Sequence, residues 1–281
     1  MRDNYGEHGV AEYYTKVGAT YRNPHYPGIR LCVFDWLNRW WTHEQPRFLT
    51  IDPEVVLFDL ACGTGEVTLA FSEWCNTGKR RYLESSEEKS SKVEISRKKV
   101  AVEPVGLDRT FPKPRILASD PFTFQAFKDR TSFPCSNLSF DSISEGALPI
   151  ESVNIVDGTT RIFPYREIQT ETTGDETNAS IITQDEARET QPAIEMVVCS
   201  FALHLVESPS SLFALLWELS LKARWLVIPA PHKKPEIKDG WGWCRWDPDS
   251  WIACQESSNR GTGELLHERV HCRFYKSTNI S

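Results

Sequence analysis

Residues 55–75, VVLFDLACGTGEVTLAFSEWC, contain the pattern that decides the fold. An apolar run at 55–58 leads into a turn of small residues at 61–65, and helical periodicity follows at 66–75. Gly63 and Gly65 allow positive φ and a close approach of the backbone to a ligand. The stretch therefore predicts a strand, a ligand-binding turn, and a helix whose free N–H groups face the same ligand.

Strands and helices alternate on the C-terminal side of this unit. The predicted strands are residues 115–119, 138–140, 194–201 and 225–228, and the predicted helices are residues 122–131 and 208–222. The strands are apolar without strict alternation, which is typical of strands buried on both faces. The pattern therefore favours an α/β protein with a mostly parallel sheet and helices on both faces.

The remaining segments define the expected domain organisation. Residues 1–50 form an N-terminal helical lid in this interpretation, and residues 51–281 form the main domain. Two stretches rich in charge, serine or threonine predict flexible insertions at about 78–114 and 151–193, the second beginning with a hairpin around Asp157 and Gly158. A late strand is expected at 268–275.

Composition narrows the class of protein. The chain has 281 residues, 40% of them hydrophobic, and a formal net charge of −7, so it has no general attraction to nucleic acid or anionic membranes. Its eight cysteines show no CxxC spacing, and no metal site is expected. The polar N-terminus and the absence of a long apolar run predict a cytoplasmic protein, with the nucleus as an alternative and no membrane partner.

The residues DLACGTG at 59–65 resemble the first motif of class I S-adenosylmethionine-dependent methyltransferases. The resemblance covers roughly 54–230 apart from the two insertions, and the overall pattern is similar to fungal proteins described only as methyltransferases. It implies a Rossmann-like seven-stranded fold, S-adenosyl-L-methionine as cofactor and S-adenosyl-L-homocysteine as product. In that family the loop wraps the methionine part of the cofactor, and Asp59 would help position its amino group. The family often has a further glycine where this chain has Glu66.

The resemblance also implies acidic residues at the ends of later strands. The ribose diol would bind Asp120 or Asp108, and Asp120 is preferred because a helix and another strand follow it. Asp141 would hold the adenine amino group beside Ser142, and Glu195 stands where the family usually has aspartate. The residues expected to bind the cofactor are Asp59, Ala61, Cys62, Gly63, Thr64, Gly65, Asp120, Pro121, Phe122, Asp141, Ser142, Cys199, Ser200 and Phe201.

Three histidines are candidate catalytic residues. His204 follows the fourth predicted strand and has a side chain whose ordinary pKa of about 6.5 suits proton removal near neutrality. His25 lies in the predicted lid, and His232 follows the strand at 225–228. For each of them a purely structural role is the alternative. The tryptophans at 241, 243, 246 and 251 form either an aromatic wall for an acceptor or ordinary packing.

The sequence leaves the methyl acceptor and the oligomeric state open. A small molecule or a protein is favoured as the acceptor because the chain is acidic. RNA is the alternative, through a local basic face such as residues 97–99, and a non-catalytic methyltransferase-like binding module is a further alternative. A dinucleotide-dependent dehydrogenase is disfavoured, since Thr68 occupies the last small position of the G-x-G-x-x-G pattern.

Overall fold

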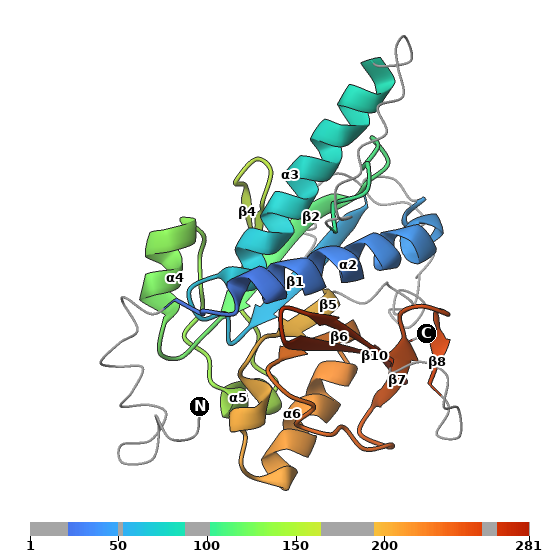
Figure 1. Cartoon of the computed structure of the whole chain (residues 1–281). Helices are drawn as coiled ribbons and strands as arrows, with labels where there is room; N and C mark the ends of the chain where they lie inside the picture. Colours follow the sequence, from blue (N-terminus) through green and yellow to red (C-terminus); the bar gives the residue numbers. More distant parts are fainter. Residues whose placement is uncertain (1–21, 50–52, 88–101, 164–193, 255–262, 281) are drawn as a thin grey trace, which may run out of the picture.

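The computed structural model describes residues 22–49, 53–87, 102–163, 194–254 and 263–280. Within these residues one ten-stranded sheet has the order β4-β3-β2-β1-β5-β6-β10-β7-β8, with β9 paired to β10 (Figure 1). The strands are β1 (Glu54–Leu60), β2 (Lys113–Ser119), β3 (Glu151–Asn154), β4 (Thr160–Ile162), β5 (Ile194–Cys199), β6 (Ala223–Ala230), β7 (Trp243–Asp247), β8 (Ile252–Ala253), β9 (Glu264–His267) and β10 (Val270–Ser277). The helices are α2 (Tyr26–Glu44), α3 (Glu66–Glu87), α4 (Phe124–Thr131), α5 (Phe140–Ser144) and α6 (Pro209–Ser220), with 3₁₀ turns η2 (Gln45–Phe48) and η4 (Leu203–Leu205).

Four neighbouring strands at the centre of the sheet are parallel. β1 pairs with β2 on one side and with β5 on the other, and β5 pairs with β6. The strand order therefore reverses at β1, and the carboxyl ends of β1, β2 and β5 meet at one edge of the sheet. In open sheets of this kind, ligands bind outside the carboxyl ends of the strands at such a reversal.

The prediction of a mostly parallel, Rossmann-like seven-stranded sheet is wrong. The described sheet has ten strands, and six of its nine pairings are antiparallel. The reason lies in the connections. A parallel pair needs a crossover of a dozen or more residues, usually a helix, whereas short turns join antiparallel strands. No described residue between β6 and β10 is helical, so these last strands return beside one another as antiparallel neighbours.

The predicted strand at 138–140 is also wrong, because residues 140–144 form the short helix α5. Ser139 caps this helix, since its side chain accepts a hydrogen bond from the backbone N–H of Ser142. Asp141 consequently lies in the first turn of a helix and not at the end of a strand. The hairpin around Asp157 and Gly158 is confirmed as β3 and β4.

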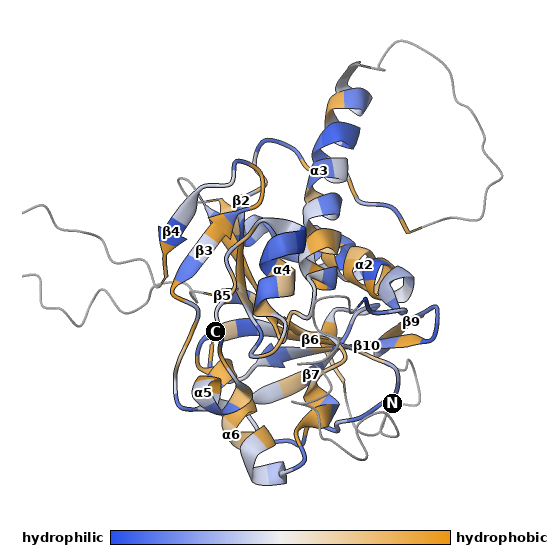
Figure 2. Ribbon diagram, turned by 90° about the vertical axis from the view of Figure 1, so that its left-hand side faces the viewer, coloured by the Kyte–Doolittle hydropathy of each residue, from blue (hydrophilic) through white to orange (hydrophobic). Residues whose placement is uncertain are grey.

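Successive residues of the central strands point to opposite faces of the sheet, and both faces are buried. Val55 and Leu57 pack in one hydrophobic cluster with α2 and α3, whereas Val56 and Phe58 pack in a second cluster with α5 and α6. This period of two is the ordinary geometry of a strand. In Figure 2 the strands of the interior carry hydrophobic colour, while hydrophilic colour covers much of α3 where it extends beyond the sheet.

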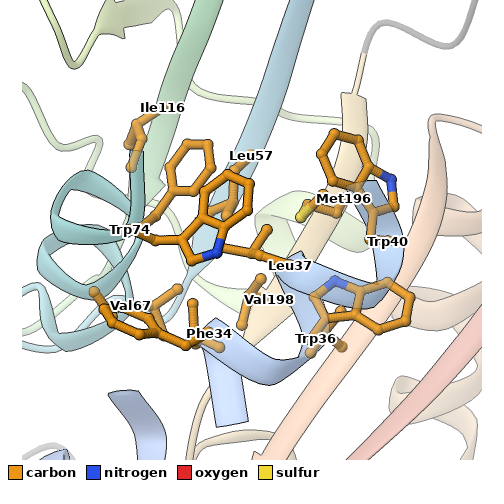
Figure 3. Packing of buried hydrophobic residues seen from close by; sticks show 14 of the residues in the cluster. Phe34, Trp36, Leu37, Trp40, Leu57, Val67, Trp74, Ile116, Met196 and Val198 are labelled. Atoms are coloured by element: carbon orange, nitrogen blue, oxygen red, sulfur yellow. The ribbon is translucent and has the colours of Figure 1, made fainter. Parts of the chain in front are cut away.

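Helix α2 fixes the first face through large aromatic side chains. Trp36 and Trp40 are fully buried, and Figure 3 shows them in one cluster with Trp74 of α3 and with Leu57 and Met196 of the strands. Burying a side chain of this size stabilises the fold by roughly 2–3 kcal/mol. The part of the expected lid at 22–49 is therefore firmly packed on the sheet, while residues 1–21 lie outside the described residues.

The expected insertions map onto the structure as follows. The predicted insertion at 78–114 begins inside α3, because this helix continues to Glu87. Residues 88–101 of the insertion lie outside the described residues. Leu107 returns to α3 and donates its backbone N–H to the carbonyl of Gly78 at 3.0 Å. The one at 151–193 begins with the β3–β4 hairpin, and its remainder at 164–193 lies outside the described residues. No described helix is long and apolar enough to cross a membrane.

Candidate functional site

A pocket of about 360 Å³ lies at the carboxyl ends of β1, β2 and β5, where the strand order reverses. Its size is within the usual range of small-molecule sites, about 300–1,000 Å³. The lining residues come from the turn after β1 and the start of α3 (60–63, 66–67), the turn after β2 (120–122), the α5 region (138–141), the segment after β5 (200–202, 205–208), Ser211 and Asn23.

Two of the strand ends that face this pocket are followed by a residue in a strained backbone conformation. Ala61 after β1 has φ 53°, and Phe201 after β5 has φ 57°, although neither residue is glycine. A left-handed conformation costs a residue with a Cβ about 1–2 kcal/mol. Such outliers cluster at ligand sites because the surrounding structure maintains them there. The packing around the pocket therefore maintains two backbone conformations that are unfavourable by themselves.

The glycine turn needs both of its glycines. Gly63 has φ +58° and Gly65 has φ +92°, which L side chains adopt rarely. A Cβ built at Gly65 would also lie 2.6 Å from Cγ2 of Thr131, so α4 closes directly over the turn.

Asp120 joins the turn after β2 to the glycine turn. One of its oxygens accepts hydrogen bonds from the backbone N–H groups of Phe122 and Thr123, both at 2.8 Å. The other oxygen accepts the N–H of Gly63 at 3.1 Å, and the Thr123 hydroxyl donates to the Gly63 carbonyl at 2.6 Å. A carboxylate offers about four lone-pair sites, so the oxygen that faces Gly63 can accept one more donor.

Glu66 opens helix α3 and lines the same pocket with only 5% of its surface exposed. Its Oε1 atom accepts hydrogen bonds from the hydroxyl of Thr64 at 2.8 Å and from the guanidinium of Arg130 at 2.7 Å. The backbone N–H of Asn23 approaches the same oxygen at 3.5 Å. The network thus ties the N-terminal segment, the glycine turn and α4 together beside the pocket.

Asp59 lies behind the pocket and not in its wall. Its side chain is 1% exposed, and one oxygen accepts the backbone N–H of Thr68 at 3.1 Å and the hydroxyl of Thr68 at 2.7 Å. The other oxygen has no hydrogen-bond partner among the described residues. Burial is the main cause that raises the pKa of Asp59 to about 8, and the nearby Glu66 and Asp120 add to the shift. The carboxyl group is therefore protonated at neutral pH.

Cys62 forms part of the pocket wall and lies against a second thiol. Its sulfur is 3.5 Å from the sulfur of Cys135, and both residues are buried. Burial raises the pKa of Cys62 well above that of an ordinary thiol. An unreactive, packed thiol is the consequence, because the thiolate is the nucleophilic form.

The structure brings most of the residues expected to bind the cofactor to this pocket. Those that line it are Ala61, Cys62, Gly63, Asp120, Pro121, Phe122, Asp141, Ser200 and Phe201. Those that do not line it are Asp59, Thr64, Gly65, Ser142 and Cys199. The alternative ribose ligand Asp108 does not line the pocket and accepts hydrogen bonds from Thr110 in a local turn.

None of the three candidate catalytic histidines lines the pocket. The ring of His25 stacks on Phe201, which lines the pocket, with a centroid distance of 5.0 Å. The rings of His204 and His232 meet edge to face at 5.1 Å. Among the described residues, no three His, Cys, Asp or Glu side chains are arranged to hold a metal ion.

Glu195 and the C-terminal tryptophans lie elsewhere. Glu195, at the start of β5 and thus at the opposite end of that strand, accepts two hydrogen bonds from Arg47 at 3.0 and 2.9 Å and one from the indole of Trp40 at 3.0 Å. Trp243 is buried and donates to the carbonyl of Leu216. None of the tryptophans at 241, 243, 246 and 251 lines the pocket.

Sequence reasoning missed several pocket residues. Glu66 was visible as an acidic residue directly after the glycine turn, where the first turn of a helix faces a ligand. Asn23 and the 205–208 segment carry no such signal, because only tertiary packing brings them to the turn.

Comparison with known proteins finds a relative whose similarity covers the whole chain. No family model matches the chain. A Schizosaccharomyces pombe protein, described as uncharacterized, is 35% identical over 280 residues, which span 100% of this chain and 93% of the relative. The similarity therefore includes the pocket and every element around it.

Proposed function

This chain belongs to the same family as the Schizosaccharomyces pombe protein, and we propose that it is an S-adenosylmethionine-dependent methyltransferase. The observation that carries the proposal is the pocket at the ends of β1, β2 and β5, bordered by a strained glycine turn, by Asp120 and by Phe201. The resemblance of residues 59–65 to the first motif of these enzymes supports the same assignment.

The residues of the pocket offer the polar and apolar contacts that this cofactor needs. Asp120 has one lone-pair site left for a ribose hydroxyl, and the buried hydroxyl of Ser200 has no partner among the described residues. Leu60 and Phe122 offer apolar contact. A buried polar atom without a partner is rare in a protein by itself, which supports a polar ligand at Ser200.

The bound cofactor supplies a methyl group that is already activated on a sulfonium. The protein then has to bind the cofactor and orient the acceptor in line with that methyl group. No histidine lines the pocket among the described residues, so we assign catalysis mainly to positioning. His25, stacked on Phe201, is the histidine we propose to act if the acceptor must lose a proton.

The charge of the pocket favours a neutral or cationic acceptor. Its lining residues include the carboxylates of Glu66, Asp120, Asp141 and Glu207, and no lysine or arginine is among them. RNA binding depends on cations that contact phosphates. A small molecule or a protein side chain is therefore the acceptor that we propose, and RNA is disfavoured.

The same charges disfavour a dinucleotide. In dinucleotide-binding folds the pyrophosphate sits at the N-terminus of the helix after the glycine turn. Here that first helical turn begins with the carboxylate of Glu66, which would repel phosphate. The eight cysteines are all free thiols, which supports a reducing compartment, and we propose the cytoplasm.

Calorimetry with S-adenosylmethionine and S-adenosylhomocysteine tests the proposal. We expect wild-type protein to bind both, Asp120→Ala to weaken binding at least about tenfold, and Gly63→Arg to abolish it. Asp108→Ala is the matched control, because this aspartate holds a local turn and does not line the pocket. Folded wild-type protein that binds neither compound would remove the proposal and favour a non-catalytic binding module.

A transfer assay then identifies the acceptor class. Purified protein receives cofactor carrying a labelled methyl group together with separate pools of small molecules, proteins and RNA. We expect label in the small-molecule or protein pool. Label confined to RNA would overturn the acceptor assignment while leaving the methyltransferase assignment intact.

A further inference from the structure

Glu66 differs from the other carboxylates of the pocket because one of its oxygens accepts several hydrogen bonds and the other accepts none from the described residues. All its hydrogen bonds, from Thr64, Arg130 and Asn23, go to Oε1. Oε2 accepts none from the described residues, and a Cβ built at Gly63 would lie 3.4 Å from it. Oε2 thus lies beside the glycine turn, on a side chain that is almost fully buried.

The other acidic side chains near the turn are less suited to pair with a buried cation. Asp120 already accepts backbone N–H groups on both oxygens. Asp59 does not line the pocket. Asp141 and Glu207 are exposed residues, where water weakens an ion pair.

We propose that Glu66 binds the α-ammonium group of the cofactor through Oε2, an inference that rests on the proposed function. An ammonium carries three N–H donors and no acceptor, so inside a pocket it needs an acceptor that is fixed in place. A charge-assisted hydrogen bond to a carboxylate is the strong form of such a contact.

Arg130 stabilises the buried Glu66 carboxylate in the free protein. It pairs with Glu66 through Oε1 from the side of α4 and does not itself line the pocket. The carboxylate is therefore oriented before any ligand arrives, which reduces the cost of ordering it upon binding. A ligand with a phosphate at this position would meet Oε2 instead of a helix N–H group, so Glu66 also selects against nucleotides.

Four nucleoside probes separate this contact from the rest of the site. S-adenosylhomocysteine and decarboxylated S-adenosylmethionine retain the amine, and the latter lacks only the carboxylate and so isolates the amine contact. 5′-Methylthioadenosine and adenosine lack the whole amino-acid part. The variant Glu66→Gln keeps Oε1 as an acceptor for Thr64 and Arg130 and removes the charge. Glu73→Gln is the matched control, since it makes the same change on α3 at a residue that pairs with Arg30 outside the pocket.

We expect Glu66→Gln to bind the two amine-containing probes about tenfold to a hundredfold more weakly, with binding of 5′-methylthioadenosine and adenosine unchanged. Glu73→Gln is expected to bind all four like the wild type. An equal loss for all four probes, or no loss for the amines, would overturn the assignment of Glu66 and leave the proposed function standing. If the wild type binds none of the four, the proposed function fails and the assignment fails with it.

Discussion

Asp59 is a buried carboxyl group that the fold keeps protonated, and replacing it with asparagine tests this directly. Desolvation raises the pKa of Asp59 from 3.8 to about 8. The unfolded chain ionises this group above pH 3.8, whereas the native protein retains the proton until about pH 8. Native protein thus binds more protons in this window, so the stability that the group contributes below pH 3.8 is lost as the pH rises towards 8.

The magnitude follows from the width of that window. About three pH units separate the ordinary pKa from pH 7, and each unit corresponds to about 1.4 kcal/mol, which gives a penalty of about 4 kcal/mol at neutral pH. Asparagine has no ionised form to desolvate, and its carbonyl oxygen can accept the two hydrogen bonds that Thr68 donates. We therefore expect Asp59→Asn to be more stable than wild type at pH 7 by up to this amount.

Urea denaturation between about pH 5 and pH 8 measures the effect. The difference in free energy of unfolding between Asp59→Asn and wild type should increase with pH by up to about 1.4 kcal/mol per unit. Asp157→Asn is the control, because hydrogen bonds from Thr159 lower the pKa of that exposed carboxyl group, so the stability that it contributes is constant between about pH 5 and pH 8 and is lost only in acid. Parallel stability curves for wild type and Asp59→Asn would mean that Asp59 is ionised in the native protein, contrary to our reasoning.

Three further outcomes test other parts of the structure. Glu195→Ala removes a buried carboxylate that pairs with Arg47 and with the buried Arg224, and should cost about 3–5 kcal/mol in urea denaturation, whereas Glu73→Ala breaks a partly exposed pair with Arg30 and should cost less than about 1 kcal/mol; equal costs would contradict this. Gly65→Ala combines positive φ with a clash and should lower the free energy of unfolding by more than Gly158→Ala, which has positive φ but open space; the reverse order would argue against the packing of α4 on the turn. Cys62 should react with iodoacetamide far more slowly in native than in unfolded protein, as followed by mass spectrometry, and equal rates would mean that the pocket wall opens readily.

The local elements could be predicted because their signals lie within short stretches of chain. The apolar run at 55–58, the glycines and the periodicity at 66–75 predicted β1, the turn and α3. The prediction failed at 138–140, where the capping side chain of Ser139 favours a helix in a stretch that is apolar enough for a strand. It also failed for the sheet, since the mostly parallel arrangement was extended from the centre to the outer strands, several of which short turns join to their antiparallel partners.

The candidate site was predictable to the extent that it follows strand ends. Ala61, Gly63, Asp120 and Phe201 come directly after strands, and parallel neighbours bring their carboxyl ends to one edge. Glu66 shows the opposite case, because its chemistry depends on which of its oxygens Arg130 occupies, and Arg130 lies 64 positions away in the chain.

The sequence by itself determined the strand–turn–helix unit, the two buried faces of the central strands and the residues that follow those strands, because period, glycine and burial are properties of neighbouring positions. Only the tertiary structure decided the pairing of the C-terminal strands, the exclusion of Asp59 from the pocket and the inclusion of Asn23. Contacts between distant segments depend on how the whole chain packs, and desolvation, which sets the protonation of Asp59, depends on that packing as well.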